Sequence, residues 1–224
     1  MAKPELWLDF ETGGVDPMVH SPLSFAMEGY DSNGNALGCW DVQIRIQPLV
    51  VEPQALKINK IDPTTPGIGL EEFKNGYFRR LNDWFYNGNK EGRTEPMIRP
   101  YAEIMPLVCG HNTSGFDNLM LKRLLGDWVG AITQGIDTMV LAATLRQWGI
   151  INPENIKLGT LLAYFDISPL EGELHTALTD IRGCKRLNET MKGILNGSRY
   201  SPEIQAALDA PGAFDPIGFM AAGE

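Results

Sequence analysis

Two carboxylates, Asp9 and Glu11, end an apolar run that reads LWLDFETGG over residues 6–14. In a β-strand, residues two apart point to the same face of the sheet. Asp9 and Glu11 therefore share one face, while Leu8 and Phe10 line the other. Two ionised carboxylates this close raise each other's pKa unless a cation lies between them. Carboxylate oxygens suit hard divalent ions such as Mg²⁺ and Mn²⁺, so the pair predicts a metal site.

Two later segments carry acids that are able to complete such a site. The stretch HNTSGFD over residues 111–117 places Asp117 in the first turn of an expected helix. The helix macrodipole favours an acid there even without a metal, and this explanation has equal weight for the segment alone. At Asp137-Thr138, we interpret the carboxylate as an N-cap rather than as a ligand.

A third segment reads HTALTDIR over residues 175–182. A His and an Asp on a helix usually mark a solvated face. Here His175 and Asp180 open a long helix and bracket apolar positions. The spacing therefore places polar groups beside the buried side of the helix.

The elements that position these residues follow from hydrophobic periodicity. A polar turn at 31–35 predicts a hairpin within an opening three-stranded meander. Strands that give way to alternating helices and strands predict an α/β domain with a mixed sheet. We assign residues 1–197 to this domain and 198–224 to an Ala-, Gly- and Pro-rich tail that drapes over it or is partly disordered. The expected strands are 5–10, 23–30, 36–46, 105–110 and 132–137, and the expected helices are 70–86, 115–125, 138–148, 158–165 and 175–195.

Composition limits the class of protein. The 224 residues are 43% hydrophobic and 21% charged, which is ordinary for a globular chain. The three cysteines form no CxxC pair, so neither a disulfide framework nor a zinc site is indicated and a reducing, cytoplasmic setting is expected. No apolar run approaches the roughly 18 residues of a membrane span, so no membrane association is expected. A net charge of −9 argues against coating duplex DNA, but it allows a protein that grips a few nucleotides through metal ions.

Taken in order, the three motifs resemble the DEDDh 3′–5′ exonuclease superfamily, which includes polymerase proofreading exonucleases, RNase T and oligoribonuclease. The resemblance runs over about residues 6–187. It implies an α/β, RNase H-like fold: a mixed five-stranded sheet flanked by helices. Residues 53–61 and 137–142 are also similar to segments of the family. The first and third motifs favour the oligoribonuclease branch, while the 87–96 loop and the tail depart from it.

The resemblance implies an activity and a set of site residues. The activity is metal-dependent hydrolysis of phosphodiester bonds from the 3′ end of single-stranded DNA or short oligonucleotides, releasing nucleoside 5′-monophosphates. Two Mg²⁺ or Mn²⁺ ions would be held by Asp9, Glu11, Asp117 and Asp180, with Asp9 bridging them. His175 would be the general base, since an ordinary His pKa of about 6.5 is near working pH. We expect His175→Ala to lower turnover far more than substrate binding.

Four residues are candidates for binding substrate. Backbone N–H groups of Thr12 and Gly13 would meet the 3′-terminal nucleotide, although a tight turn alone also explains the glycine. Asn112 lies in the second motif. Phe116 would stack on a base, although a core aromatic is at least as good an explanation. The two remaining histidines, His20 and His111, are interpreted as structural.

Several alternatives remain open at this point. One is an oligoribonuclease- or RNase T-like exoribonuclease, since DNA and RNA are distinguished by contacts to the 2′-OH that no residue here identifies. Another is a proofreading subunit that docks to a polymerase or other replication partner through tail residues such as Phe214, Ile217 and Phe219. A catalytically idle binding module and a polynucleotidyl transferase rank lower, because all four carboxylates and the His175 motif are present. Oligoribonuclease-like relatives pair as dimers, so the resemblance also makes a homodimer an option.

Overall fold

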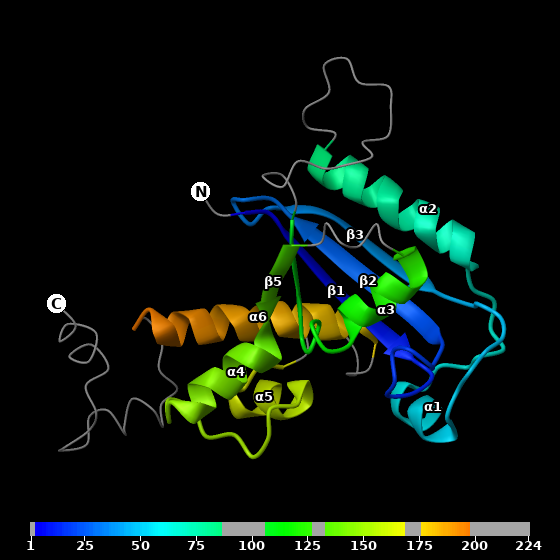
Figure 1. Ribbon diagram of the computed structural model, residues 1–224. Coiled ribbons are helices and arrows are strands. Elements are labelled where there is room, and N and C mark those ends of the chain that lie inside the picture. Colours follow the sequence, from blue (N-terminus) through cyan, green and yellow to red (C-terminus); the bar gives the residue numbers. More distant parts are fainter. Residues whose placement is uncertain (1–2, 87–105, 127–132, 169–175, 198–224) are drawn as a thin grey trace, which may run out of the picture.

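The structure, a computed structural model, describes residues 3–86, 106–126, 133–168 and 176–197. It contains a sheet, helices and one short π-helical turn, η1 (Figure 1). In chain order the elements are β1 (Glu5–Thr12), β2 (Pro22–Tyr30), β3 (Ala36–Gln43), α1 (Pro53–Asn59), α2 (Leu70–Leu81), η1 (Asn82–Tyr86), β4 (Leu107–Gly110), α3 (Asp117–Leu125), β5 (Thr133–Asp137), α4 (Thr138–Gln147), α5 (Leu158–Tyr164) and α6 (Ala177–Leu195).

The sheet has the strand order β3-β2-β1-β4-β5, with β1 at its centre. β1 pairs antiparallel with β2 and parallel with β4, and β4 pairs parallel with β5. The predicted hairpin between β2 and β3 forms at 31–35, where the Asp31 carboxylate accepts the N–H groups of Asn33 and Asn35. The prediction of a mixed five-stranded sheet flanked by helices is confirmed.

The two faces of β1 pack against different parts of the molecule. Leu6, Leu8 and Phe10 are buried in the main core with side chains from α2 and α3, such as Phe73 and Met120. The opposite face turns Trp7 toward α6, where it packs with Ala177 and Ile181. Period-two alternation in one strand thus separates the main core from the face that carries Asp9 and Glu11.

Helix α6 crosses that second face and joins the sheet to a smaller helical layer (Figure 1). Its side chains Leu187 and Met191 pack with Leu145 of α4 and Leu161 of α5. α6 is therefore buried on two sides, which accounts for its length and for its many apolar positions.

Some element boundaries differ from those expected. The predicted helix over 70–86 divides into α2 and η1, and residues 53–59 form a helix, α1, that periodicity alone did not predict. α6 begins at Ala177 rather than at 175, because the Thr176 hydroxyl caps it by accepting the N–H of Thr179. The 87–96 loop and the 198–224 tail lie outside the described residues, so the division between domain and tail stays a prediction. Within the described ranges, no helix is both long and apolar enough to cross a membrane.

Candidate metal and nucleic-acid site

β1 brings Asp9 and Glu11 to the sheet face covered by α6. Their partners on β2 are small: Asp9 lies opposite Ala26 and Glu11 lies opposite Ser24. Because cross-strand neighbours on one face are only about 5 Å apart, large partners would crowd these carboxylates. The small partners leave room beside them.

The first turn of α6 supplies a third carboxylate, Asp180. Carboxylate oxygens of Asp9, Glu11 and Asp180 all lie within 4.8 Å of one another. The structure thus brings together residues that are about 170 positions apart in the chain. Three oxygen ligands at this spacing form an arrangement able to hold a divalent cation.

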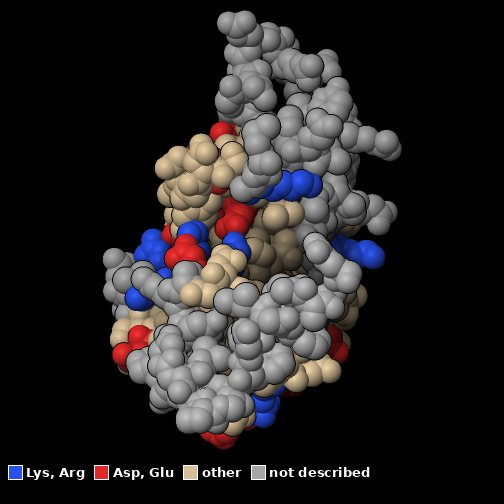
Figure 2. Space-filling view, turned by 90° about the vertical axis from the view of Figure 1, so that its left-hand side faces the viewer, with Lys and Arg blue, Asp and Glu red and all other residues tan. Residues whose placement is uncertain are grey.

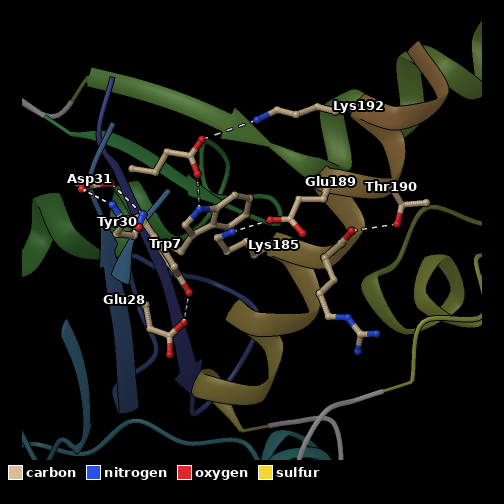
Figure 3. Close-up of polar contacts among 11 residues, drawn as sticks. Trp7, Glu28, Tyr30, Asp31, Lys185, Glu189, Thr190 and Lys192 are labelled. Carbon is tan, nitrogen blue, oxygen red and sulfur yellow. Dashed lines mark hydrogen bonds and ion pairs between the residues drawn. The ribbon is translucent and has the colours of Figure 1, made fainter. Parts of the chain in front are cut away.

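Polar contacts attach α6 to the sheet: Figure 3 shows Lys192 of α6 paired with the β1 carboxylate of Glu5, and Tyr30 bonded to Glu28 on β2. Arg182 Nε lies 3.0 Å from Oε1 of Glu28, a β2 side chain that is only 8% exposed. Glu28 also accepts a hydrogen bond of 2.9 Å from the Tyr30 hydroxyl, and Lys185 Nζ lies 4.5 Å from the centre of the Tyr30 ring. These contacts hold the N-terminal part of α6, which carries Asp180, against β2.

Asp117 reaches the site from the start of α3. Its side chain is buried, and Oδ1 accepts the backbone N–H of Phe10 at 3.1 Å. This bond attaches the start of α3 directly to β1, beside Asp9. Asp117 does not belong to the group of three mutually close carboxylates, but it lines the same cavity as Asp9.

The carboxylates of this site repel one another. Burial and the charge of Asp180 raise the pKa of Glu11 to about 7. Burial, and to a lesser degree the charges of Asp137 and Glu11, raise the pKa of Asp117 to about 8, against hydrogen bonds that lower it. The pKa of Asp9 is raised well above its ordinary value by burial and by Asp117, Asp180 and Glu11. A cation among them would relieve this repulsion, so the donor set fits hard divalent ions.

A cavity of about 300 Å³ opens beside Asp9 and Asp117. This volume is at the small end of ligand pockets. Two of the candidate substrate-binding residues, Asn112 and Phe116, contribute to its wall. The lining residues are Asp9, His111, Asn112, Phe116, Asp117, Met139, Lys157 and Leu158.

Sequence reasoning missed the part of this wall that comes from α4 and α5. Lys157 supplies the only lysine or arginine among the described lining residues, and Met139 and Leu158 supply apolar surface. Met139 lies two residues after the N-cap of α4, and Lys157 and Leu158 lie at the start of α5. No spacing in the sequence linked these three positions to the acidic motifs. His111, interpreted as structural, bonds to the Thr138 hydroxyl through Nδ1 at 2.9 Å and also lines the cavity. Burial lowers the pKa of His111.

Thr12 ends β1, and Gly13 begins the tight turn that follows it. The Gly13 N–H donates to the Ser21 carbonyl at 2.8 Å, and a Cβ at this position would lie 2.5 Å from the Val50 carbonyl oxygen. The Thr12 hydroxyl donates to the Gly14 carbonyl. A nucleotide contact of the Gly13 N–H would require its bond to Ser21 to break, and close packing alone explains the glycine.

Two further predictions concern Asp137 and His175. Asp137 is the N-cap of α4, as predicted, and accepts the N–H groups of Met139 and Val140. His175 lies outside the described residues.

The face shown in Figure 2 carries acidic and basic side chains around a hollow. Among the coloured residues, basic side chains do not form one continuous surface.

The fold is similar to solved structures of exonuclease I. For E. coli exonuclease I in complex with a dT13 oligonucleotide, the TM-score is 0.63 and the identity is 20%, covering 93% of this chain and 47% of that chain. For the zinc-ion-bound form of an E. coli ExoI–ssDNA complex, the values are 0.62 and 16%, over 92% and 42%. For an ExoI/SSB-Ct complex they are 0.60 and 18%, over 88% and 43%.

The chain therefore spans about half the length of these structures. At such identities the likeness shows the fold, the RNase H-like sheet with its flanking helices. No protein-family model matches the chain, and no curated protein does.

Proposed function

We propose that this chain is a divalent-metal-dependent 3′–5′ exonuclease that acts on single-stranded DNA or short oligonucleotides and releases nucleoside 5′-monophosphates. The observation that carries the proposal is the group of carboxylates from β1 and α6, with oxygens within 4.8 Å, beside a small cavity that also contains Asp117. The likeness in fold to an exonuclease that binds dT13 supports it.

In this proposal Asp9, Glu11, Asp117 and Asp180 hold the ions. When bound, Mg²⁺ or Mn²⁺ would stabilise the charge that develops on phosphate oxygens and make water more acidic. The burial and mutual repulsion that raise the pKa values of Asp9, Glu11 and Asp117 suit these carboxyl groups to a cation rather than to an empty surface.

The remaining wall of the cavity would hold the 3′-terminal nucleotide. Phe116, Met139 and Leu158 provide apolar surface for a base or sugar, while Lys157 provides a charge for a phosphate. Water adds to phosphorus, and the bond from phosphorus to the 3′ oxygen of the preceding nucleotide breaks. His175 is proposed, from the sequence motif, to take the proton of the attacking water, and the leaving 3′ oxygen gains one.

One assay tests the proposal. Matched 3′-labelled and 5′-labelled DNA and RNA, from dinucleotides to long single strands, are incubated with Mg²⁺ or Mn²⁺ and with a chelator. We expect stepwise shortening from the 3′ end that requires the metal, and the RNA arms decide between the deoxyribonuclease and the exoribonuclease.

The controls for this assay are two substitutions of the same kind. Asp9→Ala removes a proposed ligand, and Asp31→Ala changes a half-buried turn residue in the β2–β3 hairpin. We expect Asp9→Ala to lower turnover by more than about 100-fold, above the usual loss for an outer residue of a metal site, and Asp31→Ala to retain activity. Endonucleolytic products, or activity that survives Asp9→Ala, would contradict the assignment.

A further inference from the structure

Asp137 carries more contacts than a helix cap needs. Its Oδ1 accepts the α4 N–H of Met139 at 3.1 Å, which is the capping bond, and also the N–H of Asn112 at 2.9 Å. Its Oδ2 accepts both the N–H of Ser114 at 3.2 Å and the Ser114 hydroxyl at 2.8 Å. One carboxylate thus joins the start of α4 to the segment that precedes α3.

The neighbouring residue adds to the same junction. Thr138 is fully buried, and its hydroxyl donates to the Gly110 carbonyl at 3.0 Å and bonds to His111 Nδ1 at 2.9 Å. A Cβ at Gly110 would lie 2.8 Å from the Leu8 carbonyl oxygen, so this segment also passes close to β1. Residues 110–114 are held between β1 and the start of α4.

This segment sets the position of Asp117. Asn112 has a φ of 63°, a left-handed conformation that Asn tolerates better than most residues. Its carbonyl accepts the N–H of Phe116 at 3.0 Å, and the Thr113 carbonyl accepts the N–H of Asn118 at 2.9 Å. The turn held by Asp137 therefore leads directly into the first residues of α3.

Asp137 is unlike the acids of the metal site. Burial alone would raise the pKa of Asp137, but hydrogen bonds from Ser114, Asn112 and Val140 outweigh it and lower the pKa. Asp9, Glu11 and Asp117 have raised pKa values instead. The protein itself satisfies the charge of Asp137, so this carboxylate needs no cation.

We propose that Asp137 is a positioning residue of the site: it holds residues 112–114 in the turn that places Asp117 beside Asp9. The inference rests on the proposed function in that it takes Asp117 as a metal ligand. Asp137 acts through the turn and does not itself bind metal or substrate. Residues that orient ligands in this way typically contribute 10- to 100-fold to metal affinity or activity.

Two substitutions separate this role from helix capping. Ser114→Ala removes one bond to the turn and leaves α4 untouched. Asp137→Asn keeps an oxygen for the capping N–H groups, since Asn caps helices as well as Asp, but turns an amide group toward the N–H of Ser114. Asp31→Asn is the matched control, because Asp31 also accepts two backbone N–H groups in a turn far from the site.

The measurements are Mn²⁺ affinity by electron paramagnetic resonance, the amide resonance of Phe10 by NMR, and the urea midpoint. The Phe10 N–H donates to Asp117 Oδ1, so its resonance reports the position of that carboxylate. We expect Ser114→Ala and Asp137→Asn to weaken Mn²⁺ binding roughly tenfold and to shift the Phe10 amide, and we expect Ser114→Ala to leave the Met139 and Val140 amides in place. Asp31→Asn should leave all of these unchanged.

An unchanged Mn²⁺ affinity and Phe10 amide in both variants would show that Asp137 is only a cap, and would overturn the proposal. Wild-type protein that binds Mn²⁺ without hydrolysing nucleic acid would contradict the proposed function but leave this test intact. If wild type binds no Mn²⁺, the Phe10 amide decides: a shift in both variants supports the positioning role, and no shift overturns it.

Discussion

Three carboxylates of the site lower the stability of the protein when they are ionised and no cation is present. Asp9, Glu11 and Asp117 all have raised pKa values, because burial and neighbouring negative charges disfavour ionisation. An exposed carboxylate would not be destabilised in this way, and unfavourable burial of charged groups is common at functional sites. The buried acids therefore destabilise the metal-free protein, and metal binding would remove this destabilisation.

The raised pKa values predict how the stability of the metal-free protein depends on pH. Glu11 has an ordinary pKa of 4.5 and a folded-state pKa of about 7. Between these values the unfolded chain releases a proton that the folded chain keeps, so the free energy of unfolding falls as pH rises. At 1.4 kcal/mol per pKa unit, Glu11 contributes on the order of 3 kcal/mol to the fall.

Urea unfolding at pH 5, 6.5 and 8 in a chelator measures this fall. Glu11→Gln should make the dependence shallower, and saturating Mg²⁺ or Mn²⁺ should reduce it, since bound cations stabilise the ionised form. A metal-free protein that gains stability from pH 5 to pH 8 would contradict the raised pKa values.

Lys157 carries a second prediction at the residue scale. Lys157→Met removes the charge and keeps most of the side chain. If the ammonium binds a substrate phosphate, KM for a short oligonucleotide should rise roughly tenfold, while kcat stays within about threefold of the wild-type value. The slope of log affinity against log salt concentration should become shallower by about one. Lys122→Met, on the exposed side of α3, is the control. An unchanged KM for Lys157→Met would remove this residue from the site.

At the scale of elements, α6 both supplies Asp180 and covers the sheet. Its attachment includes the ion pair of Arg182 with Glu28, whose carboxylate is mostly buried. Removing one partner of a buried pair costs about 3–5 kcal/mol, but the Arg182 side chain is 33% exposed, so solvent reduces the cost.

We therefore expect Arg182→Met to lower the free energy of unfolding by about 1–3 kcal/mol. Adding Glu28→Gln should recover part of this loss, because it removes the buried charge left without its guanidinium. Lys74→Met, which breaks an exposed pair with Glu71 on α2, should change stability by less than about 0.5 kcal/mol. Equal losses at Arg182 and Lys74 would show that burial of Glu28 does not matter.

Features that are set within one helix or strand were predictable from the sequence, and features that depend on contacts between distant segments were not. Strand period predicted that Asp9 and Glu11 share a face, and the Asp before a helix predicted the cap at Asp137. Both depend on residues within one element. The place of Lys157 in the cavity and the bonds of Asp137 to Ser114 depend on how distant segments meet, which no local period encodes. The division of 70–86 into α2 and η1 was missed because the apolar spacing continues through both.

At the scale of the whole molecule, charge limits the nucleic-acid binding that we propose. With a net charge of −9, the protein can neutralise few phosphates outside the site. The apparent affinity for single-stranded oligonucleotides should then fall only about fourfold between 50 and 200 mM salt, whereas proteins with 6–10 phosphate contacts lose about 10³–10⁵. Binding measured by fluorescence anisotropy at fixed Mg²⁺ checks this. A steep loss would reveal a backbone-binding surface that the described residues do not explain.

The alternating register of β1 has a consequence for how the proposed activity would be inherited. An inserted or deleted residue before Asp9 would exchange its two faces, sending the acids into the core and Leu8 and Phe10 toward α6. Selection for folding and selection for chemistry therefore act on alternate residues of the same strand. A descendant that lost the activity would keep Leu6, Leu8 and Phe10 while positions 9 and 11 drifted freely. Such a pattern among relatives would separate working enzymes from idle copies before any assay is run.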